Sequence, residues 1–177
     1  LSEQIPNLDK RLIAIAVTGQ GDGMWLIDLH GAPVAPAWLW LDARAADIVD
    51  EFINSEHYAD HYSRTGTGVN VCQMSVQLAW MNRHRPGVLA KASDAFHCQD
   101  WIYFNLTGDR RTDPSQANFT FGNYNSRHYQ TDILDQLGAS TAKRLVTPSV
   151  DGTVECGHLT EAAATATGLK AGTPICL

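Results

Sequence analysis

The spacing of hydrophobic and polar positions favours strands in the first part of the chain. Residues 11–18 form a short apolar run with β-branched members, which predicts a strand buried on both faces. A glycine-dense turn follows, and residues 24–28 predict a second strand. His30 and Gly31 predict a tight turn onto a third strand near residues 35–41. The first 41 residues are therefore expected to hold three successive strands.

Helical spacing dominates the chain after residue 42. Residues 43–55 carry apolar side chains three and four positions apart, with acidic residues between them. Residues 74–84 repeat this pattern, and Pro86 marks its break. Shorter helices are predicted for residues 87–94, 100–106, 115–119, 132–137 and 142–145.

Two further stretches complete the expected architecture. Residues 95–98 predict a short strand or an extended link. Near the end, Thr160 is suited to cap a helix over residues 161–167, Gly168 is suited to end it, and Pro174 opens another strand. The chain is therefore expected to combine strands and helices.

Composition narrows the class of protein. The 177 residues are enough for one globular domain, and 44% hydrophobic with 18% charged residues is a globular composition. The formal net charge of -6 argues against a nucleic-acid or anionic-membrane surface, because both require clustered Lys and Arg. The sequence shows neither an apolar run of ~20 residues nor a basic and apolar secretory signal at its start.

The cysteines point to a cytoplasmic protein. Cys72, Cys98, Cys156 and Cys176 are widely spaced and form no C-x-x-C pair, so zinc and redox-motif interpretations are weak. We expect reduced thiols, as is usual in the cytoplasm.

The glycine-rich turn after the first strand is the main candidate for chemistry. It reads Thr-Gly-Gln-Gly-Asp-Gly, so Gln20 and Asp22 offer hydrogen bonds to hydroxyl groups while the glycines let a ligand approach the backbone. It is not a phosphate loop, because the Lys-Ser/Thr ending is missing and the G-x-G-x-x-G spacing fails. A tight hairpin entry with a solvated aspartate is the alternative.

Two other groups of residues suggest chemistry less strongly. His57 and His61 stand four residues apart, but no third metal ligand is evident, and a solvated helix face is the favoured interpretation. His97 and Cys98 lie close to Asp100, which invites a nucleophile-and-base hypothesis. Adjacency in sequence does not establish that geometry, so a structural role is favoured.

An ordered set of segments resembles the FGGY carbohydrate kinases. The set begins with strand–TGQGDG–strand and runs to the end of the chain in the family's order. Its further members are LWLDAR at residues 39–44, QLAW at 77–80, DWIYFNLTG at 100–108, TDPSQA at 112–117 and GLKAGTPI at 168–175.

The resemblance implies an α/β, ribonuclease H-like (actin-like ATPase) domain with a mixed sheet and flanking helices, and an ATP-dependent kinase acting with Mg²⁺. Residues 1–177 would be a partial N-terminal, sugar-binding domain. The phosphate-loop hairpin would lie upstream, and the turn with the catalytic aspartate and the nucleotide domain would lie downstream. ATP and Mg²⁺ would be held largely by those parts, so no catalytic residue and no metal ligand is assigned here. The segment alone is expected to lack kinase activity.

The resemblance also implies a set of substrate-binding residues. In the family the two residues after the glutamine of the turn touch the substrate, which places Gln20, Gly21 and Asp22 in the pocket. A carboxylate there can accept hydrogen bonds from two vicinal hydroxyls, which suits a polyol.

Four more residues belong to the expected pocket. Trp40 matches a tryptophan that lines the pocket, with a core position as the alternative. Asp42 is suited to bind substrate, to cap a helix or to pair with Arg44. Cys72 takes the place of a pocket tyrosine of glycerol kinases, with Gln73 beside it, and ordinary polarity before a helix is the alternative there.

The glycine turn and the Trp-Leu-Ile-Asp after it resemble erythritol kinases and the L-xylulose/3-keto-L-gulonate kinase group. Erythritol or a related short polyol is the favoured substrate, phosphorylated on a primary hydroxyl. The expected partner is thus a small sugar or polyol, with no nucleic acid and no membrane, and self-association into a homo-oligomer is left open. A non-catalytic, actin-like sugar-binding or partner-binding protein is the alternative from another class.

Overall fold

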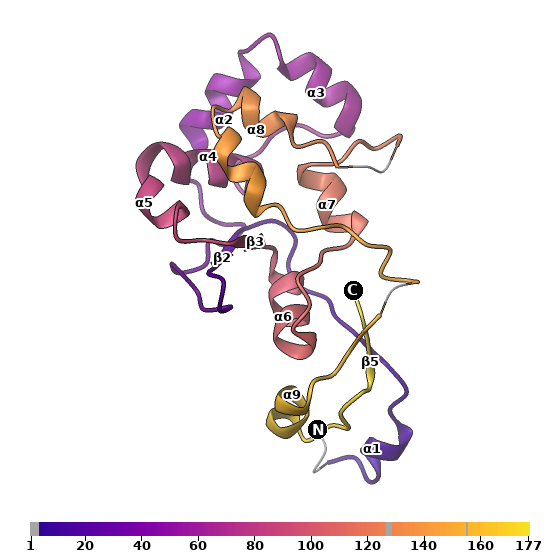
Figure 1. Cartoon of the computed structure of the whole chain (residues 1–177). Helices are drawn as coiled ribbons and strands as arrows, with labels where there is room; N and C mark the ends of the chain where they lie inside the picture. The colour runs from indigo at the N-terminus through magenta and orange to yellow at the C-terminus, as the bar shows by residue number, and fades with distance from the viewer. Residues whose placement is uncertain (1–3, 127–128, 155) are drawn as a thin grey trace.

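The structure is a computed structural model that describes residues 4–126, 129–154 and 156–177. It is a mixed α/β structure in which most helices gather at one end and a small sheet lies at the other (Figure 1). The helices are α1 Leu8–Arg11, α2 Ala46–Ile53, α3 Tyr58–Thr65, α4 Met74–His84, α5 Pro86–Leu89, α6 Cys98–Thr107, α7 Pro114–Thr120, α8 Asp132–Gln136, the 3₁₀ helix η1 Ser140–Leu145 and α9 Glu161–Thr167. The strands are β1 Ile15–Ala16, β2 Trp25–Ile27, β3 Asp94–Phe96, β4 Gly157–His158 and β5 Pro174–Cys176.

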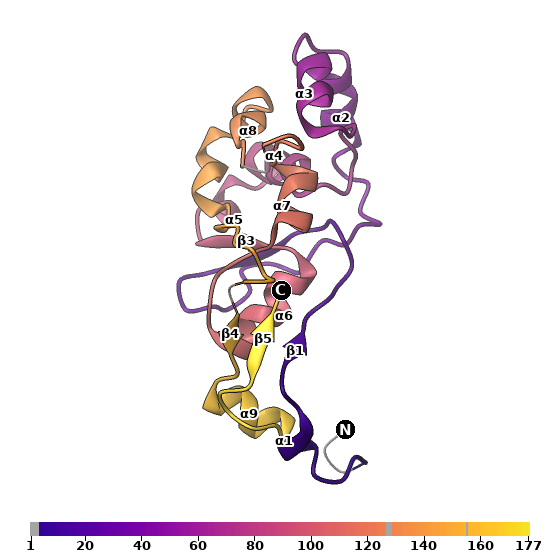
Figure 2. The ribbon, with the colours of Figure 1, turned by 90° about the vertical axis from the view of Figure 1, so that its right-hand side faces the viewer.

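The first sheet has the strand order β1-β5-β4. β1 runs parallel to β5, and β4 runs antiparallel to it (Figure 2). The prediction of a strand over residues 11–18 buried on both faces is wrong, because only Ile15–Ala16 pair and Ile13 is 86% exposed. Ile15 and Val17 pack in the core beside Tyr103, whereas Ala14 and Ala16 are exposed, so in the described part of the chain one face of the run is covered and the other is not.

The second sheet pairs β2 with β3 in antiparallel register, with Leu26 opposite Ala95. The expected strand over residues 24–28 and the extended segment at 95–98 are therefore confirmed in kind.

The third expected strand, over residues 35–41, is wrong. The hairpin folds back as predicted, but it forms only two isolated bridges to the β2 side, from Pro33 and from Trp38. Pro33 and Pro36 have no backbone N–H to donate, so a continuous ladder cannot form between the bridges.

The helical end holds the larger core. The predicted helices at residues 43–55 and 74–84 appear as α2 and α4, and α4 is buried along most of its length. Leu78 and Met81 of α4 and Phe52 of α2 are at most 2% exposed, and burying each such side chain is worth about 1.5–3 kcal/mol. None of the helices in the described part of the chain is both long and apolar enough to cross a bilayer.

Helix ends follow the expected chemistry. The Thr160 hydroxyl accepts a hydrogen bond from Ala163 N at 3.2 Å and caps α9. Gly108 and Gly168 take left-handed conformations, with φ of 78° and 71°, and end α6 and α9, the second as predicted.

The packing of helix α3 shows that one prediction, the solvent exposure of His61, is wrong. His61 was expected on a solvated helix face, but it is 3% exposed and its ring meets the edge of Phe52 with centroids 5.4 Å apart. Burial, followed by the charge of Arg64, lowers the pKa of His61. The apolar neighbour comes from α2, which the spacing of the two histidines does not reveal.

Two glycines give a matched test of how tightly β4 packs against α6. A Cβ at Gly157 would lie 2.5 Å from the Tyr103 hydroxyl oxygen and 2.8 Å from Thr107 Cγ2, whereas a Cβ at Gly87 would meet nothing within 4 Å. Gly157→Ala is expected to lower the free energy of unfolding by about 1–3 kcal/mol through overpacking. Gly87→Ala is expected to raise it by about 0.4–1 kcal/mol through the unfolded state. Urea denaturation measures both, and equal effects would contradict the packing described.

Candidate functional site

The glycine turn after β1 is seated tightly at both of its ends. A Cβ on Gly19 would lie 2.9 Å from the backbone nitrogen of Gln99, at the start of α6. Gly23 has φ of +84°, and a Cβ there would lie 2.5 Å from the carbonyl oxygen of Trp38. Gly21 between them is exposed, with nothing within 4 Å of a Cβ. The turn therefore needs glycine at its ends and leaves open space at its middle.

Asp22 is held at the tip of this turn by a distant loop. Its φ of 59° is in the left-handed region, which Asp tolerates better than most residues. The Cys72 thiol donates to Asp22 Oδ2 at 3.2 Å, and Gly23 N donates to the Cys72 carbonyl oxygen at 2.9 Å. The fold thus joins the glycine turn to residues 70–72 and fixes one oxygen of the half-buried carboxylate.

The loop before α4 is organised by its own polar side chains. Cys72 Sγ lies 2.7 Å from Asn70 Oδ1, and burial, then Asp22, raises the pKa of the Cys72 thiol to about 11, so it stays protonated at neutral pH. Gln73 is 1% exposed; its carbonyl accepts from Asn70 N and its amide donates to the Gly68 carbonyl, both at 3.2 Å. Gln73 therefore braces the loop, while Cys72 faces Asp22.

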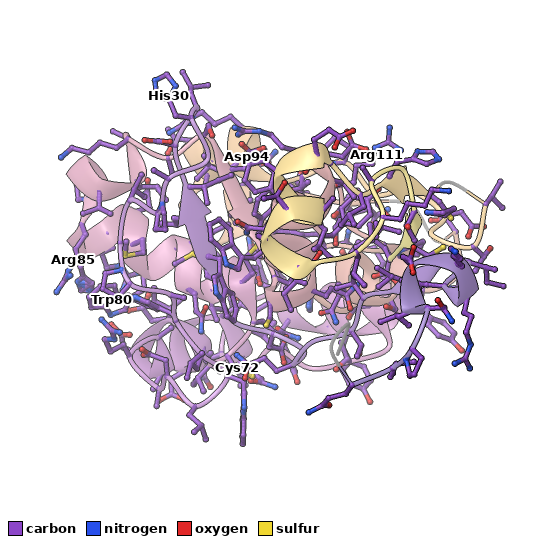
Figure 3. The ribbon with its side chains drawn as sticks, turned by 90° about the horizontal axis from the view of Figure 1, so that it is seen from below. His30, Cys72, Trp80, Arg85, Asp94 and Arg111 are labelled. Carbon is purple, nitrogen blue, oxygen red and sulfur yellow. The ribbon has the colours of Figure 1, made fainter. Side chains whose placement is uncertain are left out.

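Trp40 approaches from the hairpin. Met24 and Trp38 form an antiparallel bridge, so Asp22 and Trp40, each two residues beyond it, come to the same end of this pair. Trp40 is 51% exposed, whereas Trp38 is 4% exposed and takes the core position that was the alternative for Trp40. Cys72 and His30 lie at opposite edges of the view in Figure 3, so the site is at the far end of β2 from the hairpin tip.

The carboxylate of Asp42 is hydrogen-bonded to the side chain of Arg44. Arg44 Nε donates to both carboxylate oxygens, at 2.9 and 3.0 Å, and this hydrogen bonding lowers the pKa of Asp42. The guanidinium carbon of Arg44 stands 3.8 Å from the centroid of the Trp38 ring. The helix begins later, at Ala46, so Asp42 pairs with Arg44 and does not cap the helix, while contact of Asp42 with substrate stays a prediction.

The pocket residues predicted from sequence are thus partly assembled. Asp22 and Cys72 touch, Gly21 lies open beside them, and Gln20 is half-buried in the same turn. Such a site offers a carboxylate, a thiol and open backbone to a ligand rich in hydroxyls.

Comparison with known proteins decides the family. The model of the N-terminal domain of the FGGY family of carbohydrate kinases matches residues 2–177. The chain belongs to the FGGY family of carbohydrate kinases. The mixed sheet with its flanking helices is the actin-like fold of FGGY N-terminal domains.

Two curated relatives show how much of an FGGY kinase is present. Erythritol kinase of Brucella abortus is 46% identical over 177 residues, which cover all of this chain and 34% of that protein. L-xylulose/3-keto-L-gulonate kinase of Escherichia coli is 27% identical over 94% of this chain and 34% of its own length. The chain spans about a third of these FGGY relatives.

Solved structures agree with the fold. Xylulose kinase from Rhodospirillum rubrum superposes with a TM-score of 0.83 at 31% identity, over 93% of this chain and 34% of that one. Gluconate kinase from Lactobacillus acidophilus superposes with a TM-score of 0.82 at 20% identity, over 97% and 35%. The second likeness concerns the FGGY fold alone.

Two structural features of this FGGY domain were not assigned from sequence. The Arg44 stack on Trp38 fixes the hairpin beside Trp40. His97 and Asp100 form a buried pair in which Asp100 Oδ2 accepts from His97 N at 2.8 Å and lies 3.0 Å from His97 Nδ1. The pair caps the start of α6, and Gly19 lies against this start of the helix. The structure therefore gives the pair a structural role, which is the role that the sequence favours. An acidic residue three positions after a candidate cap was the available signal.

Proposed function

We propose that this chain forms the polyol-binding part of an ATP-dependent kinase that phosphorylates a primary hydroxyl of erythritol or a related short polyol. The observation that carries the proposal is the 46% identity to an erythritol kinase along the whole chain, against 27% to the L-xylulose/3-keto-L-gulonate kinase. That contrast supports a short polyol over a ketose, because the sequences of kinases with different substrates diverge where they contact the substrate.

The geometry gives each pocket residue a task within this proposal. Asp22 accepts hydrogen bonds from two neighbouring hydroxyls through the oxygen that Cys72 leaves free. Gly21 gives the carbon chain room to approach the backbone, and Gln20 adds an amide. Trp40 offers its exposed face to the C–H surface of the polyol. Asp42 and Gln73 support the hairpin and the loop.

The nucleotide and its Mg²⁺ are assigned to the rest of the protein. Within residues 4–126, 129–154 and 156–177, no three His, Cys, Asp or Glu side chains converge where they could hold a metal ion. ATP with Mg²⁺ supplies the phosphoryl group and the charge that stabilises its transfer. As part of the proposal, the other two thirds of the relatives' length supply that machinery, and the protein works in the cytoplasm, where ATP is available.

A substrate panel tests the proposal on the full-length protein. Phosphorylation of erythritol, glycerol, L-xylulose and 3-keto-L-gulonate is measured with ATP and Mg²⁺. We expect kcat/KM for erythritol to exceed that for each ketose about 10-fold or more. A preference for L-xylulose would favour the second relative, and polyol binding by calorimetry without turnover would favour a non-catalytic sugar-binding protein.

A further inference from the structure

Two cysteines meet in the small sheet, and neither is one of the residues of the proposed polyol site. Cys156 directly precedes β4 and Cys176 ends β5, and their sulfur atoms lie 2.6 Å apart. The antiparallel register pairs Gly157 with Ile175, so it places Cys156 directly opposite Cys176. The two thiols are 20 positions apart in sequence and are brought together by strand pairing alone.

The backbone at this place suits a covalent link. Leu159 N donates to the Thr173 carbonyl at 2.9 Å, so the pair 159/173 and, two residues on, the pair 157/175 are hydrogen-bonded pairs. The pair 156/176 is then a non-hydrogen-bonded pair, whose Cα atoms are about 4.5 Å apart in antiparallel sheets. Disulfides bridge Cα atoms about 4.4–6.8 Å apart, so the strands need not move.

The pair is open to a small reagent. Ile175 is fully buried in the core beside Tyr103, and because side chains alternate along a strand, Cys176 points to the opposite face. Both cysteines are half-buried. The hydrogen bond to Cys156, and then partial desolvation, raises the pKa of Cys176, so the pair reacts more slowly than an activated thiol.

We propose that Cys156 and Cys176 form a modification site at which a peroxide makes a reversible disulfide between β4 and β5. The thiolate of one cysteine attacks a peroxide oxygen and breaks the O–O bond. With hydrogen peroxide this gives a sulfenic acid and a hydroxide ion, which becomes water by taking up the proton that the thiol lost. The second thiol attacks the sulfenic sulfur, forming the S–S bond and releasing a second water. Both sulfurs are oxidised and both peroxide oxygens are reduced. A dithiol reductant reverses the reaction.

The inference does not depend on the proposed function, because neither cysteine belongs to the polyol site. Its consequence is mechanical: the link closes the loop from residue 156 to residue 176, which carries α9, and clamps β4 to the strand that pairs with β1. Intracellular disulfides of this kind act as transient redox sensors rather than as permanent supports.

Peptide mapping of the full-length protein tests the proposal. Cleavage after Lys and Arg puts the four cysteines on separate peptides: residues 65–83 carry Cys72, 92–110 carry Cys98, 145–170 carry Cys156, and a peptide starting at 171 carries Cys176. After treatment with hydrogen peroxide and alkylation, we expect the last two peptides to appear linked, with the mass of their sum less two hydrogen atoms. Dithiothreitol should restore both free thiols.

Serine variants set the controls. Cys156→Ser should abolish the linked pair, whereas Cys98→Ser should leave it unchanged. The proposal is overturned if peroxide gives only sulfinic acids at 156 and 176, or if either cysteine links instead to Cys98 or to another molecule. It is likewise overturned if the pair fails to form while the protein keeps its fold by circular dichroism.

Discussion

Asp22→Asn in the full-length protein is expected to raise the KM for erythritol about 10- to 100-fold. Hydrogen bonds to a charged group are worth about 1.5–3 kcal/mol, which corresponds to that range. The amide keeps one acceptor but turns an NH₂ donor toward a hydroxyl that needs an acceptor. Asn also tolerates the left-handed φ of 59° at this position, so the backbone of the turn is preserved. Steady-state kinetics with erythritol, and calorimetry for affinity, give the measurement.

A matched variant separates this effect from a general loss of charge. Asp50 is exposed on α2, so Asp50→Asn changes the net charge equally and should leave KM unchanged. If a folded Asp22→Asn protein bound erythritol as well as its parent does, the carboxylate would have no contact with substrate. The glycine turn would then serve only as a hairpin entry.

Local chemistry made much of the fold predictable. The helices α2 and α4 carry their own spacing of apolar residues, and α9 carries its own cap at its start, Thr160, and its own glycine at its end, Gly168. These signals act within a few residues of sequence, so no tertiary contact is needed to read them.

The errors concern features that depend on distant partners. The run at residues 11–18 is apolar, but its pairing is limited by the one strand that lies beside it. His61 looked solvated because the ring that buries it belongs to another helix. The segment after His30 does not continue as a strand for a local reason, because Pro33 and Pro36 interrupt the ladder, and both prolines are visible in the sequence.

The candidate site likewise contains residues that local sequence reveals and residues that depend on distant contacts. The glycine turn could be found because glycines, an amide and a carboxylate follow one strand. The contact from Cys72 to Asp22 joins residues 50 positions apart, so sequence placed Cys72 in the pocket only through a family resemblance. Sequence also could not tell that Trp38 would be buried and Trp40 exposed, because Trp38 packs on Trp80 of α4 whereas the extended backbone gives way to a turn at Trp40.

Asp100→Ala is expected to cause the largest loss of stability, about 3 kcal/mol in the free energy of unfolding. Asp100 is 1% exposed, and its Oδ2 accepts from the backbone nitrogen of His97, itself 2% exposed. Alanine would leave that buried N–H and the His97 ring without their acceptor, and it would remove the cap of α6. Urea denaturation with unchanged m-values measures the loss.

Two companion variants give this prediction its contrast. Asn105 lies on the exposed side of the same helix, so Asn105→Ala should change the free energy of unfolding by only about 0.5 kcal/mol. Asp100→Asn keeps an oxygen for His97 N, so its loss should fall between the two. Because Gly19 stands against Gln99 N at the start of α6, a loosened helix start should also unseat the glycine turn. Asp100→Asn should therefore weaken erythritol binding, although Asp100 is not one of the proposed substrate-binding residues. If the Asp100→Ala and Asn105→Ala proteins were equally stable, the pair of His97 and Asp100 would support neither the helix nor the turn.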